Sequence, residues 1–295
     1  MKEKEKKSNS KNYLVQGSIL AVASIIAKII GMIYRFPLTN TLGNEGNSYY
    51  STANEVYNIV LMISSFSLPL AVSKLVSERI HKGEYKNAHR VFLCAMRFAL
   101  IAGGALALLT YVFAGVITKY VLSIELAVYA LRVLAPAIFV FAIVGVFRGF
   151  FQGYSNMTPT AVSQVIEQIV NAIFTVVCAN IMYSYGVSLA QENGNELLGP
   201  AWGAAGGTFG TVVSITVAML FMMFVYTVQK PTLKRQMRRD VTTHLESERA
   251  IYRTMILTII PIVLSTLIYN ISNVADQGVF NKILLSQGYT EKQYT

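Results

Sequence analysis

Charged residues are scarce in this chain, and their scarcity excludes an ordinary soluble domain. Of the 295 residues, 14% are charged and 54% are hydrophobic, whereas soluble domains carry roughly 25% charged residues. Backbone groups in lipid must find partners within the protein, so an apolar stretch of about 20 residues predicts a helix that crosses the bilayer. Seven stretches qualify, at about 13–37, 49–72, 93–117, 124–147, 159–183, 201–228 and 254–281.

Residues that carry enzyme and metal chemistry are also rare. The chain has two cysteines and three histidines, and its only aspartates are Asp240 and Asp276. Their spacing fits neither a disulfide framework nor a metal site, and no nucleophile-elbow, phosphate-loop or zinc-protease motif is present. We therefore expect a protein that is not an enzyme and has no metal site. The glycine-rich run GAAGGTFG at 203–210 lies in an apolar stretch, so it predicts close helix packing instead of phosphate binding.

Basic residues give the chain a net charge of +10, but their placement argues against nucleic-acid binding. Eighteen Lys and Arg residues lie in the tail 1–12 and in the connections 73–92, 148–158 and 229–253, whereas the connections on the other side hold three. Cytoplasmic segments of membrane proteins carry such an excess, and it suits anionic lipid headgroups. We therefore expect a multi-pass protein with a cytoplasmic N-terminus.

The order of the segments predicts an all-α integral membrane fold with one complete lobe. We expect a cytoplasmic tail at 1–12, an N-terminal six-helix lobe at 13–228, a cytoplasmic inter-lobe connection at 229–253 and the first helix of a second lobe at 254–295. The first outer turn is expected at 38–48, where Gly and Asn are frequent. Transporters usually consist of matched halves, so we expect this chain to be the N-terminal portion of something longer.

Polar side chains inside the apolar stretches mark bundle interiors or aqueous cavities, because they are costly in lipid. At helical spacing they form stripes on four of the seven predicted helices, which predicts a shared cavity of both charges. The alternative is that these groups pair as interhelical contacts, for example Lys28 with Glu55 or Glu55 with Arg35. The stripes comprise Lys28 and Arg35; Glu55 and Asn58; Gln164, Glu167, Gln168 and Asn171; and Asn270, Asn273 and Asp276.

Two stretches carry motifs of a known family. Residues 25–80 contain Gly31 and Arg35, Leu42 and Gly43, and Leu68 and Pro69; residues 147–171 contain Arg148, Gly149, Gln152, Gly153, Thr158, Pro159, Ser163, Gln164, Glu167 and Gln168. Both resemble the polysaccharide-biosynthesis branch of the multidrug/oligosaccharidyl-lipid/polysaccharide (MOP) flippase superfamily. The stage V sporulation protein B-like and lipid II flippase-like proteins are the most similar subgroup.

The resemblance implies a V-shaped, MATE-like protein of two six-helix lobes, whose central cavity alternates between the membrane faces. It implies a flippase in the bacterial plasma membrane for a lipid-linked saccharide, such as lipid II or a polysaccharide repeat unit on undecaprenyl pyrophosphate. Membrane lipid and this substrate are the expected partners, and envelope-synthesis proteins are further candidates. No nucleic acid is expected.

The charges of the stripes suit such a substrate. Lys28 and Arg35 would hold the pyrophosphate by charge-assisted hydrogen bonds, and the amides would meet sugar hydroxyls. The expected substrate-binding set is Lys28, Arg35, Glu55, Asn58, Gln164, Glu167, Gln168 and Asn171. A drug or cation extruder of the same superfamily is the first alternative, but its cavity would be acidic. A non-transporting scaffold of envelope assembly is the second.

No cofactor is expected apart from a coupling ion, Na⁺ or H⁺. On the seventh predicted helix, the oxygen ligands of Asn270, Asn273 and Asp276 suit a hard cation such as Na⁺. The alternative is that Asp276 pairs with Arg35 or Lys28 across the cavity.

Overall fold

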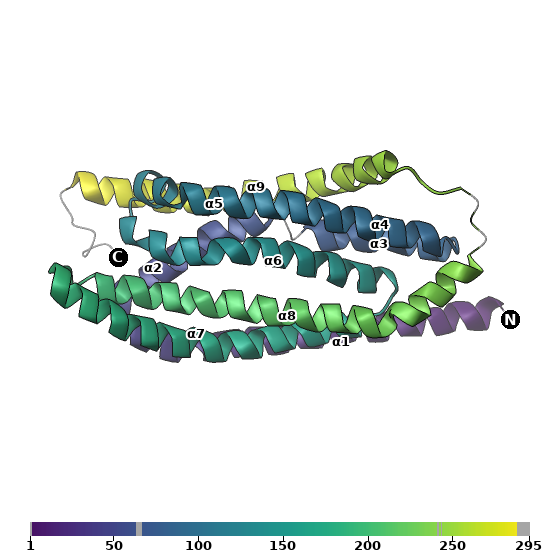
Figure 1. The fold of residues 1–295 in the computed structure, drawn as a ribbon, viewed down its shortest axis with the longest axis horizontal. Coiled ribbons are helices and arrows are strands. Elements are labelled where there is room, and N and C mark those ends of the chain that lie inside the picture. Colours follow the sequence, from purple (N-terminus) through teal and green to yellow (C-terminus); the bar gives the residue numbers. More distant parts are fainter. Residues whose placement is uncertain (1, 63–66, 241, 243, 288–295) are drawn as a thin grey trace.

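The computed structural model describes residues 2–62, 67–240, 242 and 244–287. Within these ranges, it describes the backbone but not the side chains of residues 2–14, 266–275, 277, 278, 281 and 285. This described part is helical throughout its regular structure, and the helices run side by side along one axis (Figure 1). The helices are α1 (Lys2–Ile33), α2 (Arg35–Leu61), α3 (Ser67–His81), α4 (Tyr85–Phe98), α5 (Gly104–Val116), α6 (Val128–Gly153), α7 (Thr158–Asn193), α8 (Leu198–Arg239) and α9 (Glu248–Ser286).

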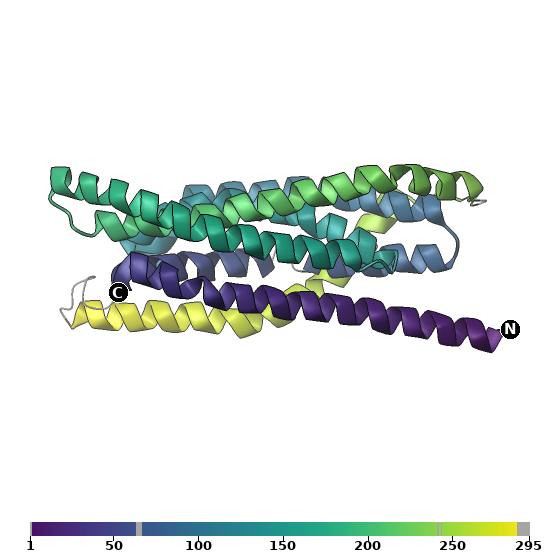
Figure 2. The same ribbon diagram turned by 90° about the horizontal axis from the view of Figure 1, so that it is seen from below.

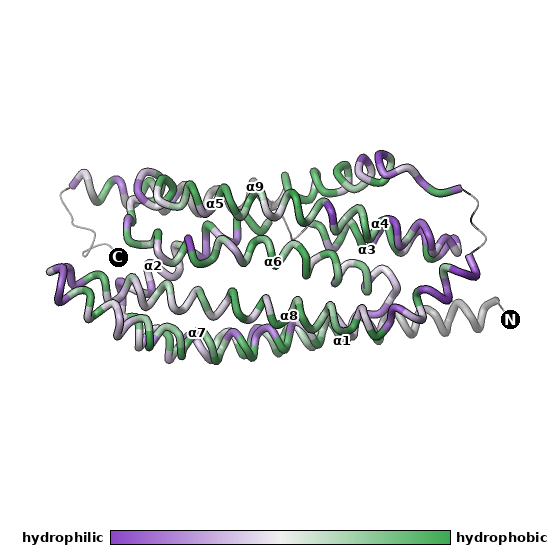
Figure 3. Tube along the Cα trace, in the orientation of Figure 1, coloured by the Kyte–Doolittle hydropathy of each residue, from purple (hydrophilic) through white to green (hydrophobic). Residues whose placement is uncertain are grey.

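Five helical segments in the described residues are long and apolar enough to cross a membrane, which confirms the all-α membrane class. They are Val15–Ile33, Tyr85–Val121, Glu125–Gly153, Thr158–Asn193 and Leu198–Arg239. Figure 3 shows the hydrophobic residues along the length of the bundle and hydrophilic ones concentrated at its two ends. The second predicted span crosses 63–66, outside the described residues, and the seventh includes side chains outside them. The count of seven therefore stays a prediction.

Proline and glycine mark the two ends of α7, as their conformations require. Pro159 lies in the first turn of α7, where its missing N–H costs no hydrogen bond. Gly194 ends the same helix in the left-handed conformation, with φ at 68°. The turn expected at 38–48 is instead helical within α2, and the helical geometry is broken at Gly43, with φ at 67°.

The predicted inter-lobe connection is partly helical. Within 229–253, α8 continues to Arg239 and α9 begins at Glu248, so the segment between these helices is shorter than expected. The hydrophobic pattern placed the boundary at the first polar residues, but a helix continues into water when its polar residues remain good helix formers. The division into two lobes itself stays a prediction.

Small residues bring α7 and α8 into close contact along much of their length, as the two views show (Figures 1 and 2). A Cβ atom added to Gly206 would collide with the backbone of Cys178, and one added to Gly210 would collide with the backbone of Thr175. The glycine run at 203–210 therefore serves helix packing, as its sequence predicted.

Helix α6 is the central helix of the bundle and packs against α2, α3, α5 and α8. Its last two turns approach α3 closely. An added Cβ on Gly149 would lie 2.6 Å from the Pro69 carbonyl oxygen, and one on Gly153 would lie 2.6 Å from the Val76 Cβ. These two glycines of the Arg-Gly-x-x-Gln-Gly motif therefore let the end of α6, which carries Arg148, pack closely against α3.

A set of polar contacts holds the α8–α9 connection against the end of the α3–α4 hairpin, and we call this set the clamp. Arg79 forms an ion pair with Glu246, and the Asn87 side chain accepts a hydrogen bond from the Glu246 backbone at 3.1 Å. The backbone N–H of Lys86 donates to Asp240 at 2.7 Å. Through the clamp, the start of α9 is fixed relative to α3 and α4.

The clamp is sensitive to acid through Asp240. Burial disfavours its charged carboxylate, but hydrogen bonds from Lys86 and Thr242 outweigh that effect and lower the pKa of Asp240. Its stabilising contribution is therefore present at neutral pH and is lost as the pH falls through the lowered pKa.

We predict that Arg79→Met destabilises the protein by on the order of 2 kcal/mol, because the Arg79 side chain is 7% exposed and its loss strands the Glu246 carboxylate. Thermal unfolding of the purified protein in detergent measures the change. Lys82→Met is the matched control, since the Lys82–Glu78 pair is solvent-exposed and contributes little. Equal melting temperatures for the two variants would show that the Arg79–Glu246 ion pair of the clamp does not stabilise the protein.

Candidate functional site

Helix α1 is attached to the bundle along one face. Among residues 15–33 only Ala23 is buried, and α1 packs chiefly against α7. Two polar contacts join the helices at this face: Gln16 accepts a hydrogen bond from the Met157 backbone N–H at 2.9 Å, and Ser24 donates to Gln164 at 3.5 Å. The rest of α1 is left free to line open space on either side of this contact.

A polar pocket of about 450 Å³ lies where α1, α2, α6, α7 and α8 meet. Its volume is within the range of small-ligand sites. It is lined by Ser24, Ala27, Lys28, Tyr57, Asn58, Leu61, Phe141, Arg148, Gln164, Glu167, Gln168 and Thr211.

An ion pair between Arg148 on α6 and Glu167 on α7 forms one wall of the pocket. The Arg148 Nη2 atom lies 2.7 Å from Glu167 Oε2, and Arg148 Nε donates to the Ser163 hydroxyl at 3.0 Å. The two charged side chains are 8% and 16% exposed. Because ions are costly to bury without partners, this pair fixes the end of α6 against one face of α7.

Lys28 gives the pocket an excess of positive charge. Its side chain lines the pocket, and within the described part of the chain it has no ion-pair partner. Glu167 is the only acidic lining residue and is already paired with Arg148. The ammonium group is therefore available to an anion that enters the pocket.

The structure brings together five of the eight residues that the sequence assigned to substrate binding. The lining includes Lys28, Asn58, Gln164, Glu167 and Gln168. Arg35 and Glu55 are exposed on α2 and do not line it, and neither forms an ion pair with Lys28 among the described residues. Binding roles for these two residues stay predictions.

Asn171, the eighth residue, lies one turn beyond Glu167 and is buried between helices. Its Nδ2 atom donates to the Tyr34 hydroxyl at 3.1 Å, and its Oδ1 atom accepts from Thr175 at 3.0 Å and from Thr211 at 3.3 Å. Asn171 thus ties α7 to α8 and to the start of α2, which fits the interhelical alternative, and its binding role stays a prediction.

The sequence did not single out Arg148, Tyr57 or Thr211 as site residues, although all three line the pocket. Arg148 was placed in a connection because it lies in a polar turn after an apolar stretch. A signal was available in the family motif, because Arg148 lies in the same stretch, residues 147–171, as its partners Ser163 and Glu167. Tyr57 and Thr211 lie beside other polar residues but carry no distinguishing pattern.

The residues proposed for ion coupling lie on α9. The side chains of Asn270 and Asn273 fall outside the described residues, whereas Asp276 is described and exposed. The ion-coupling role of the three residues therefore stays a prediction.

The described residues form a bundle of long apolar helices around a polar pocket. Two solved structures share this fold. A MOP superfamily transporter from Pyrococcus furiosus matches with a TM-score of 0.64 and 18% identity, covering 85% of this chain and 52% of that one. A multidrug resistance MATE family transporter of the same superfamily, solved in an outward-facing conformation, matches with a TM-score of 0.65, 18% identity and the same coverage. At this identity the likeness concerns the fold alone.

Sequence comparison identifies the family. Residues 14–288 match the family of polysaccharide biosynthesis proteins, and the chain belongs to it. The lipid II flippase MurJ of Bacillus subtilis is 27% identical over 285 residues, covering 94% of this chain and 51% of its own length. Stage V sporulation protein B of the same organism is 26% identical over 264 residues, covering 89% and 48%. The chain thus spans about half the length of these curated relatives.

We predict strong coupling between Arg148 and Glu167. Arg148→Met and Glu167→Gln should each destabilise the protein by on the order of 3 kcal/mol, because each strands a buried partner. The double variant should lose much less than the sum of the two. Unfolding of the four proteins in detergent completes this cycle, and Arg132→Met serves as a control, since Arg132 is exposed and lies over the Tyr111 ring. Additive losses would show that the pair is not coupled.

Proposed function

We propose that this chain is part of a transporter that moves a lipid-linked saccharide with an anionic pyrophosphate head across the bacterial plasma membrane by alternating access. The N-terminus would face the cytoplasm. One observation carries the proposal: the polar pocket holds two basic side chains against one acidic side chain, and that acid is already paired. Such a site attracts an anion.

The chemistry of crossing a bilayer explains why this arrangement is useful. A pyrophosphate-linked sugar loses its water in hydrocarbon at a prohibitive cost unless protein groups replace that water. The Lys28 ammonium would supply charge-assisted hydrogen bonds to phosphate oxygens. Gln164, Gln168 and Asn58 would supply amide donors and acceptors to sugar hydroxyls. The names of the curated relatives, a lipid II flippase and a sporulation protein, support a substrate of this class.

The charge of the pocket also ranks the alternatives. A site for cationic drugs would leave a carboxylate unpaired, whereas here Glu167 is neutralised by Arg148. A scaffold of envelope assembly would not require a polar pocket of about 450 Å³ inside the bundle.

The test is the flipping rate of a fluorescent undecaprenyl-pyrophosphate-linked disaccharide in proteoliposomes, followed by access of a membrane-impermeant quencher. Lys28→Met should lower the rate at least about tenfold, because one charge-assisted contact contributes roughly 1.5–3 kcal/mol, which corresponds to about 10- to 150-fold. Lys119→Met is the matched control, since Lys119 pairs with Glu125 outside the pocket. An unchanged rate for Lys28→Met would remove the pocket from the transport mechanism.

Ion coupling through Asp276 belongs to the same proposal. If Asp276 is a Na⁺ ligand, Asp276→Asn should abolish the sodium dependence of flipping and leave substrate binding intact. If Asp276 instead pairs with a basic residue, the variant should weaken folding or binding. Flipping rates measured with sodium or with choline separate the two cases, and transport that ignores sodium in the unaltered protein ends the Na⁺ assignment.

A further inference from the structure

The ion pair of Arg148 and Glu167 differs from the other ion pairs of the described residues because both of its partners line the polar pocket. None of the other pairs has a member in this lining. A ligand in the pocket therefore lies against both charges of the pair and against the ammonium group of Lys28.

Arg148 is held in place by contacts that do not involve Glu167. Its Nε atom donates to the Ser163 hydroxyl at 3.0 Å, and that hydroxyl donates to the Thr160 carbonyl at 2.7 Å. The Thr160 hydroxyl donates in turn to the backbone carbonyl of Arg148 at 3.5 Å. A guanidinium has more N–H groups than its bonds to Ser163 and Glu167 use. Arg148 therefore keeps its place on the pocket wall, with N–H groups to donate, when its contact with Glu167 breaks.

The charges of the pocket do not balance those of a pyrophosphate head. Each phosphate of a pyrophosphate diester is negatively charged at neutral pH, whereas the lining supplies the Lys28 cation and an Arg148 cation that Glu167 neutralises. An anion beside the Glu167 carboxylate also disfavours its charged form. Protonation of Glu167 would leave one basic side chain for each phosphate.

The surroundings of Glu167 offer no second cation at ion-pair distance. Helix α7 packs against α1, α2, α6 and α8. The titratable groups that share the pocket with Glu167 are Lys28 on α1, Tyr57 on α2 and Arg148 on α6, whereas α8 contributes the uncharged Thr211. Within the described part of the chain, Glu167 forms its ion pair with Arg148 and none with Lys28.

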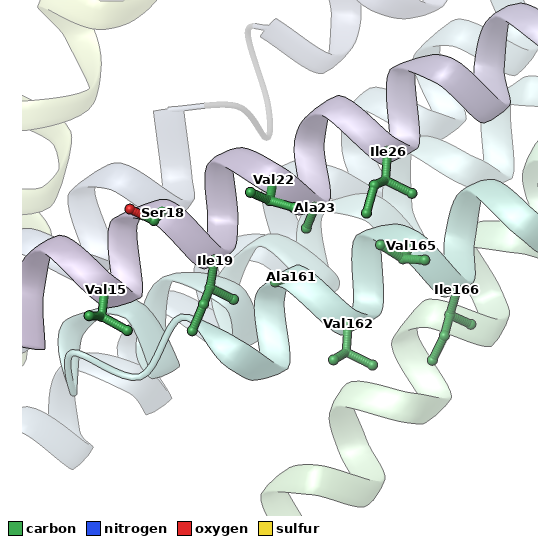
Figure 4. A pocket seen from close by; sticks show the side chains of 10 residues that line it. All are labelled: Val15, Ser18, Ile19, Val22, Ala23, Ile26, Ala161, Val162, Val165 and Ile166. Carbon is green, nitrogen blue, oxygen red and sulfur yellow. The ribbon is translucent and has the colours of Figure 1, made fainter.

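The far side of the contact between α1 and α7 is apolar. Val165 and Ile166, which directly precede Glu167, line a groove there with Val22 and Ile26 of α1 (Figure 4). A carboxylate without a partner would gain no stabilisation from that side, and an unpaired ion is costly to bury. If a phosphate replaces Glu167 as the partner of the guanidinium, Glu167 therefore takes up a proton.

We propose that Arg148 is a second phosphate ligand of the pocket, and that Glu167 releases it by taking up a proton. A phosphate oxygen of the head replaces the Glu167 carboxylate at the guanidinium, so the Arg148–Glu167 ion pair breaks. The proton comes from water, an O–H bond forms on the Glu167 carboxyl, and this O–H donates to the phosphate. The inference rests on the proposed function and adds that the head is bound together with a proton.

Isothermal titration calorimetry of the purified protein in detergent tests this proposal. The ligand is a disaccharide linked by pyrophosphate to a shortened polyprenyl chain, and the free alcohol of the same chain is the headless control. Titrations in buffers of different ionisation enthalpy count the protons taken up for each lipid bound. We expect about one proton per headed lipid and, by linkage, about tenfold tighter binding for each unit by which the pH falls.

Variants of the pocket separate the roles of the charged groups. Glu167→Gln should bind the headed lipid at least as tightly as the unaltered protein at neutral pH, without proton uptake, because the amide does not neutralise Arg148. Lys28→Met should bind more weakly and still take up a proton. Glu125→Gln is the matched control and should behave as the unaltered protein, since Glu125 pairs with Lys119 outside the pocket.

Infrared difference spectroscopy of the unaltered protein gives a second measurement, which does not require Glu167→Gln to fold. The headed lipid should produce the C=O band of a protonated carboxyl group, and this band should shift when glutamate is labelled with ¹³C. Binding of the headed lipid without proton uptake would overturn the inference and leave the proposed function standing. Proton uptake that persists in Glu167→Gln would also overturn the inference. Binding no stronger than that of the headless alcohol would overturn both.

Discussion

The buried ion pair of Arg148 and Glu167 is the interaction on which the polar interior of this bundle depends. A guanidinium inside a membrane bundle requires a carboxylate close by, and here the pair joins α6 to α7 at 2.7 Å. The pair sets the position of the polar face of α7, which presents Gln164 and Gln168 to the same pocket. It also neutralises the acid of the pocket, so the charge that is left without an ion-pair partner among the described residues of the lining is the cation of Lys28.

The packing around this pair explains which parts of the molecule are rigid and which are loosely held. Glycines fix α6 to α3 and α8 to α7 at backbone contact, and the clamp fixes the start of α9 to the α3–α4 hairpin. Helix α1 has neither kind of constraint and rests on α7 through one face.

Much of the fold could be predicted from the sequence because hydrophobic length alone determines spanning helices. The stripe at Gln164, Glu167 and Gln168 was predicted because helical spacing places these residues on one face. Asn171 shares that spacing, yet Tyr34 and Thr211 cover it, and such coverage depends on neighbouring helices that periodicity does not describe. Arg148 was missed for the same reason, since its partner on α7 became visible only when α6 was seen to continue to Gly153.

The central claim is that the Lys28 ammonium binds the anionic head of a lipid. The most direct measurement is the ³¹P–¹⁵N dipolar coupling between a bound lipid-linked pyrophosphate and lysine side-chain nitrogens, recorded by solid-state NMR on the membrane-embedded protein. The account predicts a strong coupling that disappears in Lys28→Met and persists in Lys119→Met. A coupling that survives the loss of Lys28, or that is absent while the lipid remains bound, would contradict it.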